Sequence, residues 1–377
     1  MNQPHPPVSA DVPAYYPALD GLRAIAVFLV MLEHLNPPEW LNPRPWLFPG
    51  KMGVQLFFVL SGYLIGGILM RQNLRLRAAG QSPFSKAKSF WTRRALRIVP
   101  AYYFLIAIVV FLKVPQHILS LLPWLFTYTY NVSAFLTQGF NYPVNHFWSL
   151  ACEEQFYILL PLCLLPAKPS WFPWIIGIMG LTGMLSVFLF IYTGYNIIYA
   201  SMLLPATFQF FAAGIFVAWL QLTDRKFPLF AWLPLLIPVY VLLSQRPFLY
   251  PGKNLLNEVL PVFPILCAGL IHWVTKGNAP KVLTGFLTSA PLVRFGLYSY
   301  GLYLFHNVVP QVYFLISLRT GFSIEADSMF YVFFFLSLLI AALSYHFLEL
   351  PFLRLSICPD LIALSPILSK TFWECSK

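Results

Sequence analysis

Long apolar segments separated by short polar ones form the main pattern of this sequence. Runs of about 18 or more apolar residues are long enough to cross the hydrocarbon core of a bilayer as α-helices. Nearly every such segment lacks a polar face, so a large water-soluble core does not explain the pattern. We therefore predict ten transmembrane helices, at residues 18–35, 52–70, 98–113, 147–166, 172–192, 205–222, 229–244, 258–275, 292–318 and 329–349.

A weaker apolar run at 117–135 raises the question of an eleventh span. With ten spans and a cytoplasmic N-terminus, 16 of the 24 Lys/Arg fall on the cytoplasmic side and 6 outside, as the positive-inside bias requires. An eleventh span would move cytoplasmic basic residues to the outside, among them Lys168, Arg225, Lys226, Lys276 and Lys281. We therefore expect 117–135 to be an interfacial or re-entrant piece, and its Trp124, Tyr128 and Tyr130 suit a membrane surface.

Composition and charge location favour a membrane protein over a nucleic-acid-binding one. The chain is 59% hydrophobic and only 10% charged, whereas soluble domains average about 25% charged residues. The net charge of +11 lies mainly between apolar spans, and residues 71–97 alone carry eight Lys/Arg and no acid. Such a segment anchors a membrane protein beside anionic lipid. We therefore expect a lipid bilayer as a partner, and no nucleic acid.

These observations define the fold class and the domains. We predict an all-α, polytopic transmembrane helical bundle of about ten spans with both termini in the cytoplasm. Residues 1–17, with five prolines and no basic residue, are expected to form a disordered tail. Residues 18–350 form the transmembrane domain, and 351–377 a short cytoplasmic tail. The five cysteines are scattered and form no CxxC pair, so we expect neither disulfides nor a metal site.

The first predicted helix carries polar groups that cannot face lipid cheaply. Arg23 and His34 are eleven residues apart, within about 20° of three full turns, so they share one face about 16 Å apart along the axis. Asp20 lies within about 40° of His34 in the same projection. Because a charge at mid-membrane costs at least ~2.5–3.5 kcal/mol, we expect this stripe to face the bundle interior, with His34 near the outer side. The alternative is that Arg23 snorkels to headgroups and His34 merely caps the helix end.

A second polar group lies in the segment NHFWSLACEEQFY, which enters the fourth span from outside. Glu153 and Glu154 are about 100° apart around a helix, so they cannot point the same way. Glu153 shares a stripe with Ser149 and His146, so we assign Glu153 to the interior and Glu154 to a secondary role. A contact between Glu153 and His34, both in the outer half, would let the carboxylate orient the imidazole. The alternative is a buried ion pair that only locks helix packing.

The segment RRALR, just before the third span, contains a pair of arginines. Arg94 and Arg97 are three residues apart and are therefore neighbours on a helix. Guanidinium groups bind phosphates bidentately, so this pair suits a nucleotide-bearing co-substrate at the cytoplasmic mouth. The alternative is an ordinary basic pair beside the membrane.

The segment LYSYGLYLFHNVV places Ser299, Tyr303 and His306 at positions i, i+4 and i+7, on one helical face. Hydroxyls and an imidazole inside a span need partners. We treat these three residues as secondary candidates for the site, with helix packing as the alternative.

Five segments in this order together resemble the acyltransferase family 3 membrane proteins. They are LDGLRAIAVFLVMLEH, FFVLSGYLI, RRALRIVPAYY, FWSLACEEQFYILLP and SYGLYLFH. The resemblance spans residues 16 to 350 and would make 18–350 an acyltransferase domain. It implies an O-acetyltransferase of the bacterial inner membrane that moves an acyl group, often acetyl, from cytoplasmic acyl-CoA to a hydroxyl. Acceptors in the family include lipopolysaccharide O-antigen, exopolysaccharide and other cell-envelope glycans, and small molecules.

The resemblance also assigns roles by motif. The family's intramembrane Arg and His fall on Arg23 and His34, its RxxR on Arg94 and Arg97, and its WSL-x-x-E on Glu153. We expect acyl-CoA as co-substrate with Arg94 and Arg97 on its phosphates, and no permanently bound cofactor. His34 would act as general base on the acceptor hydroxyl, with Glu153 orienting it. An acyl-His34 intermediate is the alternative.

A transporter is the main rival function, because ion and proton pathways also use intramembrane Arg, Glu and His. A transporter is expected to have broken helices in paired halves, and the sequence shows no such internal symmetry. A membrane assembly factor without catalysis is a third interpretation.

Overall fold

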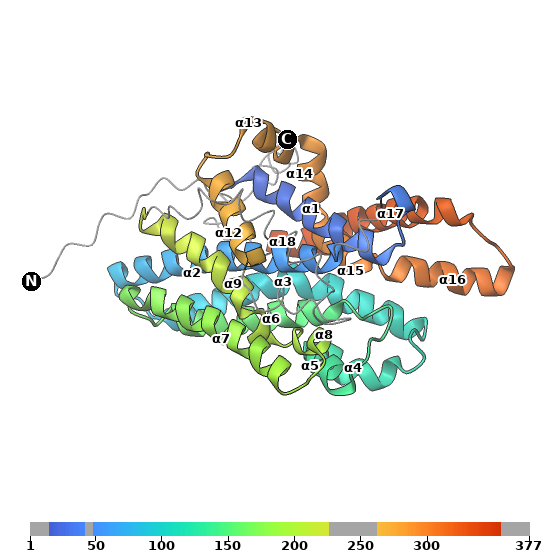
Figure 1. Ribbon diagram of the computed structural model, residues 1–377, viewed down its shortest axis with the longest axis horizontal. Coiled ribbons are helices and arrows are strands. Elements are labelled where there is room, and N and C mark those ends of the chain that lie inside the picture. The colour runs from blue at the N-terminus through green and yellow to red at the C-terminus, as the bar shows by residue number, and fades with distance from the viewer. Residues whose placement is uncertain (1–14, 42–47, 226–261, 356–377) are drawn as a thin grey trace, which may run out of the picture.

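The structure, a computed structural model, describes residues 15–41, 48–225 and 262–355, and within them the chain folds entirely into helices and their connections (Figure 1). The predicted span 229–244 lies outside the described residues, as does the start of the span 258–275. Most of the two predicted tails, 1–17 and 351–377, also lies outside them.

Helices of very different length make up the described fold. Their bounds are α1 Pro17–His34, α2 Pro49–Ala79, α3 Pro83–Phe111, α4 Ile118–Phe126, α5 Tyr130–Thr137, α6 Phe147–Leu164, α7 Phe172–Tyr192, α8 Ile197–Ala200, α9 Leu204–Leu222, α12 Val262–Thr275, α13 Lys281–Leu287, α14 Ala290–Leu297, α15 Ser299–Phe305, α16 Val308–Thr320, α17 Ala326–Ser344 and α18 Leu350–Leu355. A π-helical turn, Tyr345–Glu349, joins α17 to α18.

Six helical segments of the described chain are long and apolar enough to cross a membrane. They are Pro49–Ala79, Lys86–Phe111, Pro169–Tyr192, Leu204–Leu222, Ser299–Thr320 and Ser328–Arg354. Two further predicted spans coincide with the 18-residue helices α1 and α6, which carry the charged residues of interest. The all-helical fold class is thus confirmed for the described residues, whereas the count of about ten spans and the orientation of the termini stay predictions.

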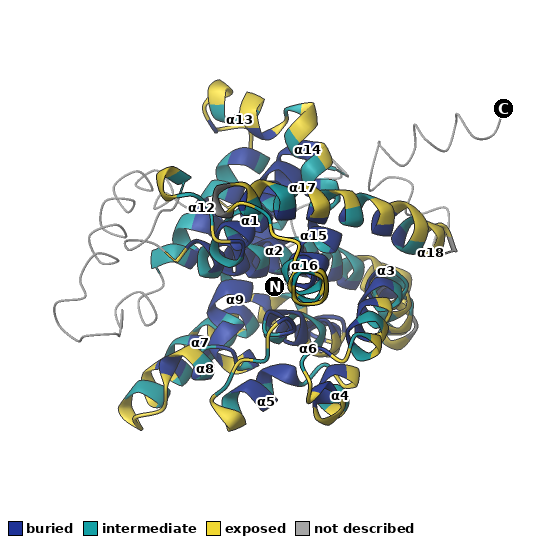
Figure 2. Cartoon of the chain, turned by 90° about the vertical axis from the view of Figure 1, so that its right-hand side faces the viewer, coloured by how far each residue is buried: buried dark blue, intermediate teal, exposed yellow. Residues whose placement is uncertain are grey.

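The outer surface of α7 has the character of a lipid-facing helix. Trp174, Ile178, Leu181, Leu185 and Phe188 recur at helical spacing and are each more than half exposed. A water-soluble helix would present polar side chains along such a stripe. Buried residues instead gather on α1, α2, α9 and α15 at the centre of the bundle (Figure 2). The chain is therefore an integral membrane protein.

Close backbone packing between α2 and α9 forms the centre of the bundle. A Cβ atom added at Gly62 of α2 would collide with the carbonyl oxygen of Phe211 on α9, and one added at Gly214 of α9 would collide with the carbonyl oxygen of Val59. Small residues in membrane helices permit this approach. The Gly62-x-x-x-Gly66 motif therefore has an architectural role.

Replacing Gly62 with alanine is expected to destabilise the protein by about 1–3 kcal/mol, because the two backbones must move apart. Gly177 on α7 offers a matched control, since an added Cβ there meets no atom within 4 Å. Thermal unfolding of the detergent-purified variants would compare the two. A Gly62→Ala protein as stable as Gly177→Ala would contradict this account of the α2–α9 contact.

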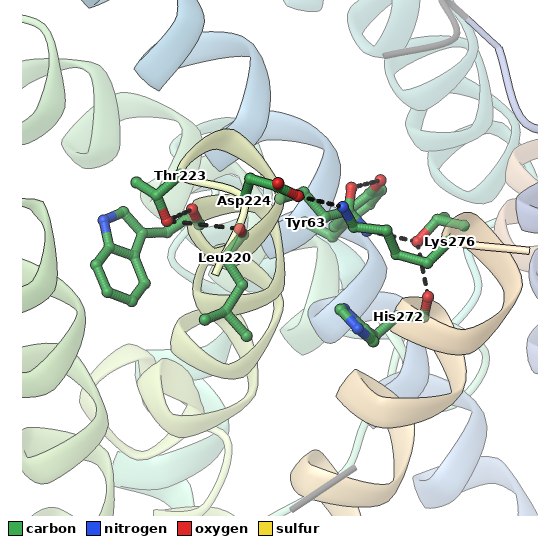
Figure 3. Close-up of polar contacts among 9 residues, drawn as sticks. Tyr63, Leu220, Thr223, Asp224, His272 and Lys276 are labelled. Atoms are coloured by element: carbon green, nitrogen blue, oxygen red, sulfur yellow. Dashed lines mark hydrogen bonds and ion pairs between the residues drawn. The ribbon is translucent and has the colours of Figure 1, made fainter. Parts of the chain in front are cut away.

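A polar cluster ties α2, α9 and α12 together at one end (Figure 3). The Tyr63 hydroxyl donates to Gln221 Oε1 at 2.8 Å, and Gln221 Nε2 donates to Thr275 Oγ1 at 2.6 Å. Lys276 pairs with Asp224 at 3.2 Å. The first two bonds give the buried Tyr63 and Gln221 side chains their partners.

A side chain near the end of α2 holds the C-terminus of α6 in place. The buried Asn73 side chain donates to the carbonyl oxygens of Leu164, Leu165 and Ala167 at 2.7–2.9 Å. The last carbonyls of a helix have no partner within the helix. Asn73 therefore caps α6, which carries the two candidate glutamates.

The weak apolar run 117–135 folds as two short helices, α4 and α5, separated by residues 127–129. At nine and eight residues, neither reaches the about 20 residues that a span needs. This geometry agrees with an interfacial or re-entrant piece, whose position in the membrane stays a prediction.

The predicted span 292–318 is not one continuous helix. It is divided into α14, α15 and α16, with breaks at Tyr298 and at His306–Asn307. Pro310 explains the second break, because it has no N–H for the His306 carbonyl and its ring clashes with that carbonyl in a continuous helix. The predicted span is thus helical but interrupted, and Ser299–Thr320 within it is long and apolar enough to cross a membrane.

Candidate active site

A cavity of about 80 Å³ lies among α1, α2, α3, α6 and α15. This volume is room for several water molecules. Its lining combines charged, hydroxyl and aromatic groups. The residues are Arg23, Val54, Phe57, Phe58, Leu60, Ser61, Arg94, Arg97, Ile98, Ser149, Leu150, Glu153, Tyr157, Ser299, Tyr300 and Tyr303.

Positive charge dominates this lining. Arg23, Arg94 and Arg97 contribute three guanidinium groups, and Glu153 contributes the one carboxylate. Guanidinium groups bring five N–H donors each and bind phosphate and carboxylate oxygens bidentately. The cavity is therefore suited to an anionic ligand.

Arg23 is held at the edge of the cavity by its neighbour one turn earlier on α1. Arg23 Nη1 lies 3.2 Å from Asp20 Oδ1, and the Tyr15 hydroxyl donates to Asp20 Oδ2 at 2.7 Å. The Arg23 side chain remains 24% exposed. Asp20 thus orients Arg23.

The two arginines of the RRALR segment both reach the cavity from α3, as their spacing on a helix requires. The Arg94 guanidinium stacks 5.1 Å from the centre of the Tyr157 ring and 5.8 Å from that of Phe90. These cation–π contacts fix the plane of the group. Arg94 is therefore positioned before any ligand arrives.

Of the two adjacent glutamates, Glu153 lines the cavity and Glu154 does not. Glu153 Oε1 accepts a hydrogen bond from Ser61 Oγ at 2.9 Å, and Ser61 also contacts the Tyr157 hydroxyl at 3.1 Å. The sequence-based expectation of a Glu153–His34 contact is not what the structure has. Glu153 lies at the level of Arg23, and a helix of this rise puts His34 about 16 Å further along α1.

His34, the last residue of α1, contacts a different histidine. Its Nδ1 lies 3.0 Å from Nε2 of His306, and the two ring centres are 5.1 Å apart. His34 is half-buried and is not part of the cavity lining. The candidate site thus has two parts, the arginine cavity and a histidine cluster.

A third histidine, His146, completes the cluster just before α6. Its ring centre lies 4.9 Å from that of His306. Nε2 of His146 donates to the Leu304 carbonyl at 3.2 Å, and Nδ1 accepts from the Asn307 side chain at 3.0 Å. Both ring nitrogens of His146 therefore have partners that suit a neutral ring.

Tyr303 connects the cavity with the histidine cluster. Its side chain lines the cavity, where its hydroxyl contacts Ser149. The same hydroxyl lies 3.1 Å from the His146 carbonyl oxygen, and its ring centre lies 5.8 Å from that of His306. The two parts of the site therefore share a wall, as the common face of Ser299, Tyr303 and His306 implied.

Sequence reasoning missed several residues of this arrangement. Ser61, Tyr157, Tyr300, His146 and Asn307 were not selected as site residues, yet they line the cavity or bind within the cluster. His146 carried a signal, because it shares a stripe with Ser149 and Glu153. The others had none in the sequence.

Comparison with known proteins identifies the family of this chain. Residues 16–347 match the model of the acyltransferase 3 family, which is described as Acyltransferase domain. The chain is 28% identical over 375 residues to the O-acetyltransferase OatA of Staphylococcus aureus, in strain NCTC 8325 / PS 47 and in strain COL. The alignment covers 90% of this chain and 57% of each relative, so the chain spans little more than half of their length. No solved structure matches it. With its family match extending over most of the bundle and both parts of the site, this chain belongs to the acyltransferase 3 family.

Proposed function

We propose that this protein is a membrane O-acetyltransferase that moves an acetyl group from cytoplasmic acyl-CoA to a hydroxyl of a cell-envelope carbohydrate. The observation that carries the proposal is the cavity in which three arginines and Glu153 meet next to a histidine cluster. The family match and the name O-acetyltransferase printed for OatA support the same activity. We place the protein in the bacterial cytoplasmic membrane.

Acyl-CoA binds through its phosphates in this proposal. Arg94 and Arg97 are its binding residues, because both guanidinium groups line the cavity and phosphates are their preferred partners. Arg23 lines the same cavity from α1, and the pantetheine arm of the co-substrate passes it on the way to His34. Glu153 offsets part of the positive charge, so that the three arginines can remain close together while the cavity is empty.

The transfer itself takes place at His34. His34 removes the proton from the acceptor hydroxyl while the oxygen attacks the thioester carbonyl. The new ester C–O bond forms, the C–S bond breaks, and the proton passes from His34 to the departing CoA thiolate. Since His34 lies outside the cavity lining, the thioester reaches it along the wall that Tyr303 provides.

A variant of the same scheme has an acetyl group on His34 itself. The imidazole attacks the thioester first, and the acceptor hydroxyl then takes the acetyl from the ring nitrogen. Ping-pong kinetics and a burst of CoA release distinguish this two-step route from direct transfer.

The experiment that tests the function is acetylation by membranes of cells that express the protein, supplied with radiolabelled acetyl-CoA. We expect label to appear in the envelope glycan fraction as a base-labile ester, and to be absent from membranes with His34→Ala. The same vesicles measure flux of labelled acetyl-CoA without transfer. Flux with no ester would favour the transporter, and ester formation with the His34→Ala protein would favour an assembly factor.

A further inference from the structure

The helix break at His306 has a chemical consequence for His34. Because α15 ends at Phe305, the carbonyl of Tyr303 lies in its last turn, where backbone acceptors lack helical partners. His306 Nδ1 lies 2.8 Å from this oxygen and 3.2 Å from the Leu302 carbonyl oxygen. The imidazole of His306 thus caps its own helix.

The cap determines which nitrogen of His306 carries the proton. Carbonyl oxygens only accept hydrogen bonds, so Nδ1 of His306 must be an N–H donor. In a neutral imidazole the other nitrogen is then an acceptor. His306 is completely buried and packs against the neutral ring of His146. Its hydrogen-bond partners within the described part of the chain are two backbone carbonyls and His34, and none of them is a carboxylate that would favour a second proton.

The same argument applies to His34, the next member of this hydrogen-bond chain. His34 Nδ1 lies 3.0 Å from the accepting Nε2 of His306, so it must be the donor of this bond. Neutral His34 then has its proton on Nδ1 and its lone pair on Nε2. We infer that His306 is a positioning residue that holds His34 in the tautomer whose Nε2 accepts a proton.

This inference rests on the proposed function, and it explains how the general base His34 is held in the tautomer that the reaction needs. In catalytic triads a carboxylate holds the histidine in its working tautomer. Here the orienting group is a second histidine, whose own state is set by a backbone carbonyl. When His34 takes up the acceptor's proton, its Nδ1–H still donates to His306 Nε2, so the chain of bonds needs no rearrangement during the reaction.

Two substitutions of His306 separate positioning from packing. Glutamine has a side-chain oxygen that can take the place of Nε2 and accept from His34, whereas phenylalanine fills the space without an acceptor. If His306 positions His34, we expect His306→Phe to lower kcat on the order of 10²-fold, while His306→Gln stays within about tenfold of the unchanged protein. If His306 only packs, phenylalanine is the better substitute in this buried place and the order reverses, which would overturn the inference.

A spectrum reports the tautomer without any reaction. We expect ¹⁵N-histidine-labelled protein in nanodiscs to show His34 protonated on Nδ1 and unprotonated on Nε2, with the His34 signals assigned by their loss in His34→Gln. Loss of this tautomer in His306→Phe supports the inference, and a proton on Nε2 of His34 in the unchanged protein refutes it. If the unchanged protein transfers no acetyl group, the proposed function has failed, and the spectrum alone decides the inference.

Discussion

Replacing His34 with alanine is expected to reduce acetyl transfer on the order of 10²–10⁴-fold, the usual contribution of a positioned general base. The reason is geometric, because the bond from His34 Nδ1 to His306 puts the lone pair of the neutral ring on Nε2, the atom proposed as the base. Formation of base-labile acetyl ester from labelled acetyl-CoA measures the effect. Binding of acetyl-CoA should change little, since His34 does not line the arginine cavity.

His346 provides the matched control for this substitution. It is an exposed histidine in the π-helical turn, where its Nε2 lies 3.5 Å from the Tyr298 hydroxyl and its ring contacts those of Tyr298 and Tyr345. His346→Ala should keep the transfer rate within about twofold, since surface substitutions away from special features rarely exceed about 0.5 kcal/mol. A His34→Ala protein that folds and retains this same rate would remove His34 from the mechanism, including the route through an acyl-His34 intermediate.

Much of the fold follows from apolar run length and helical geometry. The predicted span 172–192 has the same bounds as α7, and the predicted span 205–222 differs from α9 by one residue. Bilayer thickness sets these lengths, so the sequence alone contains the information. Pro310 also encodes the interruption at His306, but a prediction based on the length of the apolar run alone does not detect it.

The candidate site could be predicted only in part. The sequence shows which residues share a face of one helix, but it does not show which residues of another helix they contact. Helical spacing tells which residues share a face, so Arg94 with Arg97 and Ser149 with Glu153 enter the same cavity. Spacing does not tell which helix packs opposite. The bond from His34 to His306 joins residues 272 positions apart, and it depends on how α1 packs against α15.

This difference explains the one contact that was assigned to the wrong partner. A carboxylate is the usual orienting group for a catalytic imidazole, and Glu153 was the candidate within reach by depth alone. In the structure Glu153 bonds to Ser61 within the arginine cavity, and His34 bonds to a second imidazole. The charged side chains therefore lie in the cavity, while hydrogen bonds between neutral groups hold the histidine cluster together.

Replacing Arg97 with alanine is expected to raise the KM for acetyl-CoA by about 10-fold to 100-fold, because charge-assisted hydrogen bonds contribute roughly 1.5–3 kcal/mol. Binding made equally in the ground state and the transition state affects KM more than kcat, so kcat should stay close to that of the unchanged protein. Arg97→Lys keeps the charge without the planar fork, so its KM should fall between those of the unchanged protein and Arg97→Ala.

Arg93 is the control on the same helix. Its loss removes an equal charge but no part of the cavity lining, because its side chain bonds to Ser89 instead. Steady-state kinetics over a range of acetyl-CoA concentrations measure all three variants. If Arg93→Ala raised KM as much as Arg97→Ala, attraction by the whole basic segment 71–97, rather than a phosphate site in the cavity, would account for acyl-CoA binding.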